Sequence, residues 1–250
     1  QYLLESSVQH AGERIRIAVH LIKASDESHL WSERYDRELQ SVFELQDEVT
    51  QQIVSSLQVK LTSDEDKIFG YLATSSIEAH DTLLRAVVVY LNYSQNTVEE
   101  AIALFTKIIE LDPDYAAAHA WLARALTFQW IMFWVKDKSI LDTALAYAQH
   151  AIELDPQSPY AMSILGWVHF WRKETEASKY SKQAVALDPN NAEALLILSL
   201  ILSSAGLGEE GLIYIEKAKR LSPTPASLYE YALGNCYYVL KDYKKAIAVY

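Results

Sequence analysis

The sequence predicts a mainly α fold, in which stacked pairs of α-helices form a superhelix (a solenoid) and a small partial α/β module precedes them. Three observations lead to this prediction. A short tag that ends in proline recurs through the second part of the chain, and small residues stand at fixed distances before it. The first 60 residues lack the tag and instead alternate apolar and polar residues, which is typical of strands.

The composition excludes several classes of protein. Half of the 250 residues are hydrophobic and 22% are charged, which is typical of a globular chain with a sizeable core. The net charge is −11, and Lys and Arg form no cluster that would neutralise phosphates, so we expect no nucleic acid as a direct partner. The longest apolar runs are shorter than the about 20 residues of a membrane-spanning helix, so we expect no membrane insertion. The chain starts inside an apparent strand and stops inside an apparent helix, which favours a fragment of a longer protein.

The first elements are two strands joined by a tight turn. The stretches YLLESSVQ and RIRIAVHLIK predict a β-hairpin with Gly12 in the turn. In the second stretch the apolar residues alternate onto one face: Ile15, Ile17, Val19 and Leu21. The stretch HLWSE is predicted to form a short third strand.

An amphipathic helix is predicted from Ser41 to about Leu61. Ser41 and Glu44 form a capping box, a pattern that starts many helices. Apolar residues then recur every four positions, as they do on a helix that covers a sheet: Leu45, Val49, Ile53 and Leu57.

The segment between the third strand and this helix is read as a structural joint. Trp31 and Tyr35 are expected to be core or interface anchors, with Asp36 and Arg37 as local hydrogen-bond partners in the turn into the helix. Asp36 and Glu33 have no accompanying nucleophile, so we do not expect them to be catalytic.

The repeat follows with a period near 34 residues. The tags end at Pro113, Pro156, Pro189 and Pro223, which are 43, 33 and 34 residues apart. Small residues stand five and twelve positions before the last three of these prolines: Ala151, Ala184 and Ala218, and Ala144, Ala177 and Gly211. Side chains seven apart share a helix face, so a neighbouring helix can approach closely there. Because proline fits a first turn but not a helix interior, each tag is expected to end one helix and start the next.

This pattern resembles the tetratricopeptide repeat (TPR) over residues 79–250. The last unit matches the family's spacings most fully, through Leu233, Gly234, Tyr237, Ala246 and Tyr250. The first unit is degenerate and the fourth is loose. The resemblance implies about four and a half helix pairs, the last of them truncated.

The first proline spacing is longer than the others, which implies an insertion around residues 127–139. Trp130, Phe133 and Trp134 fall within it. Two interpretations stay open. The helix pair is longer here and packs these aromatic residues on a neighbour, or the residues form an exposed contact patch for a partner.

Residues 1–62 resemble the second half of the TolB-like α/β module, which precedes TPR units in many bacterial regulatory proteins. The resemblance rests on three motifs in order: Leu30-Trp31, Tyr35-Asp36-Arg37 and Leu45-Gln46-Asp47-Glu48. It implies a module over 1–62, a connecting segment over 63–78 and the repeats over 79–250. In that family a class III nucleotide cyclase domain or a winged-helix DNA-binding domain often lies further upstream.

We find no pattern of residues that would support catalysis. The seven histidines do not pair at zinc-ligand spacings, and seven glycines form no phosphate-binding loop. Cys236 is expected to be buried, and His119 and His169 are expected to be core histidines with satisfied hydrogen bonds. We therefore expect no catalytic residues, no metal and no cofactor, so this chain is predicted not to be an enzyme.

The TPR resemblance implies that a partner binds the concave face, which the first helix of each unit forms. Carried onto this sequence, the expected groove residues are Arg124, Tyr160, Trp167, Phe170, Leu196, Leu200, Tyr231, Asn235 and Tyr238. Only Arg124 and Asn235 could clamp a terminal carboxylate, so we expect aromatic and apolar contacts to dominate. A foreign segment, the chain's own continuation or a second copy could fill this groove.

The sequence thus favours a non-catalytic interaction and regulatory scaffold of a bacterial signalling or transcriptional regulator. Its expected partner is a protein or peptide, and this includes a second copy of itself. Two alternatives stay open: a homo-oligomerisation module, and the regulatory tail of a class III nucleotide cyclase. The cytoplasm is favoured over the periplasm.

Overall fold

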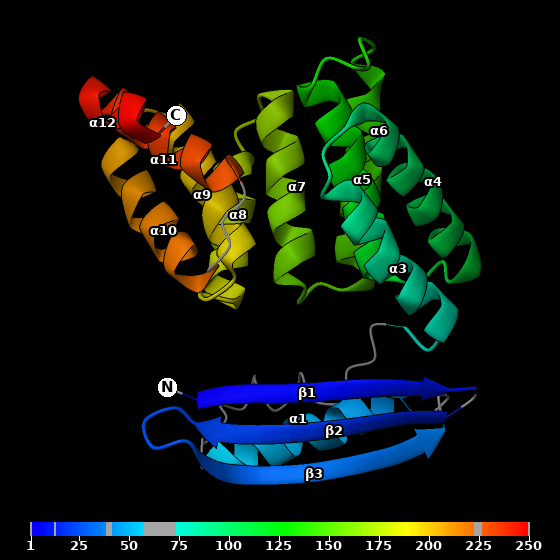
Figure 1. The fold of residues 1–250 in the computed structure, drawn as a ribbon. Coiled ribbons are helices and arrows are strands. Elements are labelled where there is room, and N and C mark those ends of the chain that lie inside the picture. The colour runs from blue at the N-terminus through cyan, green and yellow to red at the C-terminus, as the bar shows by residue number, and fades with distance from the viewer. Residues whose placement is uncertain (1, 13, 39–41, 58–73, 223–226, 250) are drawn as a thin grey trace. The chain divides into compact units, whose positions relative to one another are not determined.

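A computed structural model describes residues 2–12, 14–38, 42–57, 74–222 and 227–249. The chain forms two compact units, Gln1–Ile77 and Glu78–Tyr250 (Figure 1). Among the described helices, none is long and apolar enough to cross a membrane.

The first unit contains an antiparallel sheet in the order β1-β2-β3, formed by Tyr2–Ala11, Arg14–Lys23 and Ser28–Glu38. The predicted hairpin is confirmed. Gly12 has a φ of +63°, a left-handed conformation that glycine adopts without a steric clash. The third strand is 11 residues long rather than short, because its pairing with β2 continues from Ser28 as far as Glu38.

Helix α1 (Val42–Leu57) packs against one face of this sheet. The buried residues of this small core are Ile15, Val19, Tyr35 and Leu45, as the alternating pattern predicts, and Trp31 and Val49 pack around them. Ser41, the predicted cap, and the expected end of the helix at 58–61 lie outside the described residues.

The expected role of Asp36 in a turn is wrong. Asp36 lies in β3, where it forms ion pairs of 2.7 Å with both Arg14 and Arg16 on β2. These hydrogen bonds lower the pKa of the Asp36 carboxyl. The carboxylate therefore ties two strands together rather than holding a turn.

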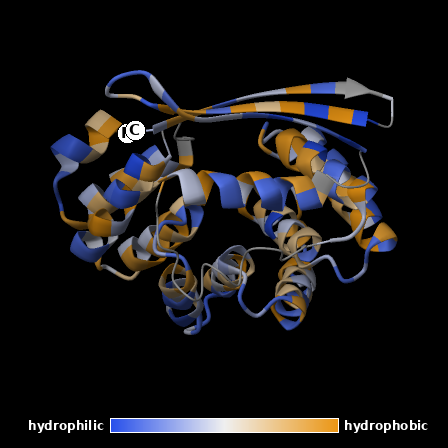
Figure 2. Cartoon of the chain, turned by 90° about the horizontal axis from the view of Figure 1, so that it is seen from below, coloured by the Kyte–Doolittle hydropathy of each residue, from blue (hydrophilic) through white to orange (hydrophobic). Residues whose placement is uncertain are grey.

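The second unit consists of helix pairs. Their bounds are α3 (Ile77–Tyr90), α4 (Gln95–Leu111), α5 (Ala116–Ile131), α6 (Ser139–Leu154), α7 (Pro159–Arg172), α8 (Ala177–Leu187), α9 (Ala192–Ser204), α10 (Gly208–Leu221), α11 (Ser227–Val239) and α12 (Tyr243–Val249). Helices α5, α7, α9 and α11 contact one another in succession, and each also packs on the helix that follows it. This is the predicted TPR-like superhelix (Figure 1). Hydrophobic and hydrophilic segments alternate along the helices (Figure 2), as expected where each helix buries one face.

The recurring tag has a local physical role. In three turns an Asp side chain accepts a hydrogen bond from the backbone N–H two residues later: Asp112 from Asp114 at 3.3 Å, Asp155 from Gln157 at 3.0 Å, and Asp188 from Asn190 at 2.9 Å. Such turns favour the exit from a helix.

The prolines of the tag do not start the next helix, contrary to the prediction. They lie in the turn, and the next helices begin three residues later, at Ala116, Pro159 and Ala192. The hydrogen bond between the Asp side chain and the backbone N–H two residues later spans the proline, so the next helix begins only after this turn. Pro223, of the fourth tag, lies outside the described residues.

The small residues of the repeat are buried, as predicted, where helices approach closely. A Cβ added at Gly166 of α7 would lie 2.3 Å from Ser181 Oγ and 3.0 Å from the Ser181 backbone nitrogen. At Gly211 it would lie 2.9 Å from the sulfur of Cys236. Cys236 is fully buried, and this burial raises the pKa of its thiol.

Candidate partner-binding face

The first helices of the pairs carry the expected groove residues. The structure places Arg124 on α5, Tyr160, Trp167 and Phe170 on α7, Leu196 and Leu200 on α9, and Tyr231, Asn235 and Tyr238 on α11. These residues fall into four groups with different surroundings: a buried polar bridge, a closed stretch on α9, an aromatic cluster on α7 and a more open stretch on α11.

The polar bridge joins α5 to α9. Arg124 Nη1 forms an ion pair of 2.6 Å with Glu193 Oε1, and Arg124 Nε donates a hydrogen bond of 3.3 Å to the Tyr90 hydroxyl. The guanidinium also lies over the rings of Trp121 and Tyr90, at 5.2 and 5.5 Å from their centroids. Burial alone would lower the pKa of Arg124, but Glu193 and the surrounding tyrosines outweigh it and raise that pKa. Arg124 is therefore a charged side chain that already has its partners.

Tyrosines surround this ion pair. Tyr160 of α7 packs against Trp121 with ring centroids 4.9 Å apart. Its hydroxyl is buried and has no hydrogen-bond partner of good geometry among the described residues. Burial raises the pKa of Tyr160 well above its usual value and that of Tyr90 to about 12, although Arg124 opposes both shifts. Both phenols are thus neutral near pH 7.

The stretch on α9 is closed. Leu196 and Leu200 are buried in a core with Tyr229 and Leu233, and Trp167 of α7 packs against the same core. Aromatic side chains from the two neighbouring helices therefore cover the face of α9 that was expected to line an open groove. Leu196 and Leu200 are only 1% and 3% exposed, so they offer no surface to a partner, contrary to the expectation.

The C-terminal half of α7 carries an aromatic cluster. Trp167 stacks on Phe170 with centroids 5.8 Å apart, and Trp171 contacts both rings at 5.6 and 5.5 Å. The indole nitrogen of Trp171 is buried without a hydrogen-bond partner among the described residues. Sequence reasoning missed Trp171 because it lies outside the four repeat positions that usually face a partner.

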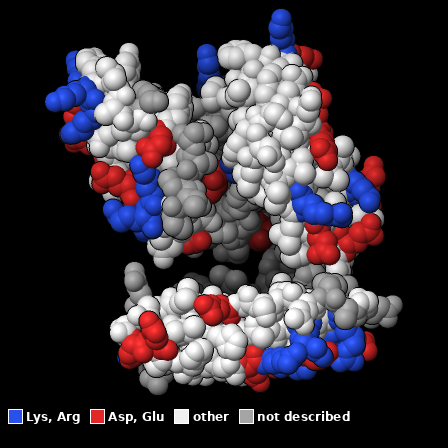
Figure 3. All heavy atoms as spheres, viewed as in Figure 1, with Lys and Arg blue, Asp and Glu red and all other residues white. Residues whose placement is uncertain are grey.

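The open stretch is on α11. Tyr231 is 50% exposed and Tyr238 is 61% exposed, with the half-buried Asn235 between them. The spacings of four and three residues put all three on one helix face. Most charged side chains of the helical unit lie along its outer flanks in the view of Figure 3. The other aromatic residues of the expected groove, Tyr160, Trp167 and Phe170, are at most half-exposed. The exposed aromatic surface of that groove is therefore concentrated on α11.

The three aromatic residues of the inserted segment differ in their exposure. Trp134 packs on Phe128, with ring centroids 5.7 Å apart, at the edge of the core formed by α3, α4 and α5. Phe133 is 82% exposed and has a φ of +58°, which is uncommon for a bulky residue. Trp130 is half-buried. One expected aromatic residue thus packs on a neighbour, while another points to solvent.

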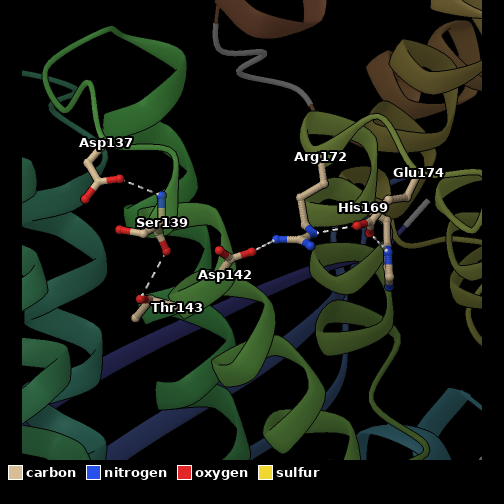
Figure 4. A network of polar contacts seen from close by, with 7 residues as sticks. All are labelled: Asp137, Ser139, Asp142, Thr143, His169, Arg172 and Glu174. Atoms are coloured by element: carbon tan, nitrogen blue, oxygen red, sulfur yellow. Dashed lines mark hydrogen bonds and ion pairs between the residues drawn. The ribbon is translucent and has the colours of Figure 1, made fainter.

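A network of hydrogen bonds and ion pairs links the turn between α7 and α8 to α6 (Figure 4). Arg172 forms an ion pair with Asp142 of α6, and its Nε donates to Glu174 Oε1 at 2.8 Å. Glu174 Oε2 lies 2.6 Å from Nδ1 of His169. Burial would raise the pKa of Glu174, but the hydrogen bonds from His169 and Arg172 prevail and lower it. The network is structural, and it fits the prediction that His169 is a satisfied core histidine.

No group of three or more His, Cys, Asp or Glu side chains that could hold a metal ion occurs within the described part of the chain. No protein-family model matches the chain.

The comparisons with known proteins give one curated relative and several solved structures. The chain is 38% identical over 173 residues to "Putative adenylate cyclase 3" of Rhizobium meliloti (strain 1021). The matched part is 67% of this chain, and it spans 30% of that protein's length.

The solved structures concern the fold. A thermophilic TPR protein of Thermus thermophilus matches 68% of this chain and 87% of its own, with a TM-score of 0.55 and 18% identity. A monomeric mutant of IFIT1 with Gppp-AAAA matches 68% of this chain and 40% of its own, with a TM-score of 0.56 and 20% identity. These likenesses agree with the helix pairs described above, so the second unit has the TPR fold.

Proposed function

We propose that this chain is a non-catalytic interaction region of a bacterial signalling protein, and that it binds a segment of a partner protein at the aromatic surface of α11. The observation that carries this proposal is the exposure of Tyr231 and Tyr238 on one helix face, at 50% and 61%. Exposed tyrosines that become buried on binding supply much of the affinity at protein interfaces. The TPR fold supports the proposal because solenoids commonly bind partners on the surface of their stacked helices.

The contacts of Arg124 restrict the kind of partner segment that this face can bind. Its guanidinium is paired with Glu193 and enclosed by aromatic rings, so it does not clamp a terminal carboxylate. The remaining surface on α11 offers the exposed aromatic rings of Tyr231 and Tyr238. A segment with apolar side chains fits this surface best.

The test incorporates a photo-crosslinking amino acid at position 231 or 238 of the chain. The protein is expressed in bacterial cells, and the protein that becomes crosslinked to it is identified. The same residue at position 213 is the control, since Ile213 is 67% exposed but lies on α10. Affinity for the captured partner is then measured with purified proteins. Tyr231→Ala/Tyr238→Ala should weaken binding by roughly 30-fold or more, because an aromatic anchor contributes about 2 kcal/mol or more. An unchanged dissociation constant, or equal capture from position 213, would refute the proposal.

A second candidate function is favoured by the curated relative. We propose that the chain is the regulatory region of a class III nucleotide cyclase, because 173 of its residues are 38% identical to a protein with a cyclase name. The order of three strands and a helix in the first unit also supports a TolB-like module in front of the repeats. Cyclic AMP formation by the whole parent protein, with and without residues 79–250, tests this. The absence of cyclase activity from both forms would exclude this second function and leave the binding proposal intact.

A further inference from the structure

The face of the sheet that points away from α1 is polar. Successive residues of a strand point to opposite faces, and Ile15, Val19 and Tyr35 pack toward α1. The residues between them therefore lie on the other face. The register of the three strands arranges these residues in rows: Gln9, Arg16 and Asp36, then Ser7, Ala18 and Arg34, then Glu5, His20 and Ser32. Neither the core of this unit nor the proposed function uses this face.

A shallow depression lies at the centre of this face. Ala18 stands there with a single methyl group, so the longer side chains around it form a rim. The Glu33 carboxylate belongs to the α1 face, where it accepts hydrogen bonds of 3.1 Å from Trp31 Nε1 and 3.2 Å from the Tyr35 hydroxyl. It therefore does not place its negative charge in the depression. The volume is about 430 Å³, and the lining consists of Ser7, Gln9, Arg16, Ala18, His20, Ser32, Glu33 and Arg34.

The charge around the depression is positive. Arg14 and Arg16 share one carboxylate, since Asp36 accepts from Arg14 at Oδ1 and from Arg16 at Oδ2, each at 2.7 Å. Arg16 uses its Nε and Nη2 in this contact, which leaves its Nη1 available. The Arg34 guanidinium forms no ion pair or hydrogen bond with any residue that the structure describes. Glu38 stands opposite Arg14, outside the lining.

The sheet brings together arginines that are far apart in the sequence. Pairing of β2 with β3 puts Arg16 beside Asp36 and Ala18 beside Arg34. In Figure 3 the Lys and Arg side chains of the first unit gather mainly at one end of it. The order of residues in the sequence shows no such cluster, because Arg16 and Arg34 belong to different strands.

The hydrogen-bond donors on the rim fit a phosphate group. Arg16 and Arg34 supply guanidinium N–H groups, while Ser7 adds a hydroxyl and Gln9 an amide. A phosphate monoester presents three strongly accepting oxygens, whereas a carboxylate presents two. A rim with four donor side chains therefore matches a phosphate group better than a carboxylate.

We propose that this depression binds the phosphate group of a small phosphate ester. Arg34 supplies a free guanidinium and Arg16 its remaining N–H groups, and the planar guanidinium is well suited to phosphate oxygens. Ser7 and Gln9 donate from the neighbouring strand β1. The volume of about 430 Å³ lies within the range of small-molecule sites, so the ester carbon atoms fit beside the phosphate.

The test titrates inorganic phosphate, and then glycerol phosphate, into the isotopically labelled 250-residue chain at constant ionic strength. The backbone amide signals of β2 and β3 are followed by NMR, with chloride as the control anion. Both phosphates should give saturable shifts centred on Ala18 and Arg34. Arg34→Gln should weaken phosphate binding at least about tenfold, because hydrogen bonds to a charged group are lost.

A second variant fills the depression without changing its charge. Ala18→Phe places a ring at the centre of the lining and should abolish the phosphate-dependent shifts. Phenylalanine is favoured in strands, and position 18 lies on the face away from the core, so this variant should keep the fold.

Arg37→Gln is the matched control, because Arg37 is a neighbouring exposed arginine of β3 that points to the α1 face and pairs with Glu48 at 3.5 Å. This variant should keep the wild-type affinity. The proposal is overturned if the wild type shows no saturable shift, if chloride produces the same shift, or if Arg34→Gln binds phosphate as tightly as the wild type. An equal loss in Arg37→Gln would also overturn it. A phosphoserine peptide that binds at least about tenfold more tightly than glycerol phosphate would overturn the assignment to a small molecule.

Discussion

Arg124 on α5 and Glu193 on α9 form an ion pair of 2.6 Å although α7 contacts both of these helices and packs between them. The two residues are 69 positions apart in the sequence. Arg124 stands at a position that was expected to face a partner in a TPR groove. Their pairing therefore closes part of that groove from within and confines the open aromatic surface to α11.

Removal of Glu193 should destabilise the helical unit. Glu193→Ala leaves the buried Arg124 without its counter-charge, and breaking a buried pair in this way costs about 3–5 kcal/mol. Because a quarter of the Glu193 side chain is exposed, we expect the free energy of unfolding, measured with urea, to fall by about 2–3 kcal/mol.

Glu210→Ala is the control for this measurement, since it breaks the exposed pair with Lys182 and should cost about 1 kcal/mol or less. A loss for Glu193→Ala no larger than for this control would mean that the bridge does not hold α5 and α9 together.

Gly166 should not tolerate a side chain. Gly166→Ala places a Cβ 2.3 Å from Ser181 Oγ and 3.0 Å from the Ser181 backbone, so α7 and α8 must separate. Overpacking of this kind costs about 1–3 kcal/mol, which thermal unfolding can measure. Adding Ser181→Ala removes only the hydroxyl contact and should restore part of the stability. Full wild-type stability of Gly166→Ala alone would contradict the close approach.

The network around Glu174 should weaken at acid pH. The folded state lowers the pKa of Glu174 below its usual value of 4.5. The contribution of this carboxylate to stability is therefore present above that value and is lost as the pH falls through the lower, folded pKa. Glu174→Gln should cost about 0.5–1 kcal/mol near pH 7, as expected for a partly exposed pair. The difference from wild type should shrink as the pH falls below 4.5 and through the lowered, folded pKa of Glu174. A cost that does not change with pH would contradict this account.

The single thiol should react slowly. Cys236 is fully buried and its pKa is raised by burial, so little thiolate is available to an external reagent. Native protein should react with a disulfide reagent at least about a hundredfold more slowly than urea-unfolded protein, because labelling requires local opening. Equal rates would show that α9 and α10, which carry Ser199 and Gly211, do not cover this position.

The sequence reveals the helix pairs because their signals are local. Tags that end in proline and small residues at fixed distances from them report on contacts between neighbouring helices, and these contacts agree with the structure. The length of β3 could not be predicted in the same way, since Leu30, Trp31 and Tyr35 are its only apolar residues and its second half is mostly charged. Its polar residues Arg34 and Asp36 pair with β2, which no local pattern reveals.

The candidate site was predicted less completely than the fold. The repeat positions identify Tyr231 and Tyr238, but they do not reveal that Leu196 and Leu200 are covered by aromatic side chains from adjacent helices. Such burial depends on how tightly successive pairs wind, which is a property of the assembled superhelix.

The most direct measurement for the central claim is the solution mass of the chain over a wide range of concentrations. If the α11 surface is reserved for a foreign segment, wild type and Tyr231→Ala/Tyr238→Ala should both remain monomers of 28.4 kDa at every concentration. A dimer that forms in the wild type and in Ile213→Ala, but not in the tyrosine double variant, would contradict the account. In that case the tyrosines of α11 would bind a second copy of the chain.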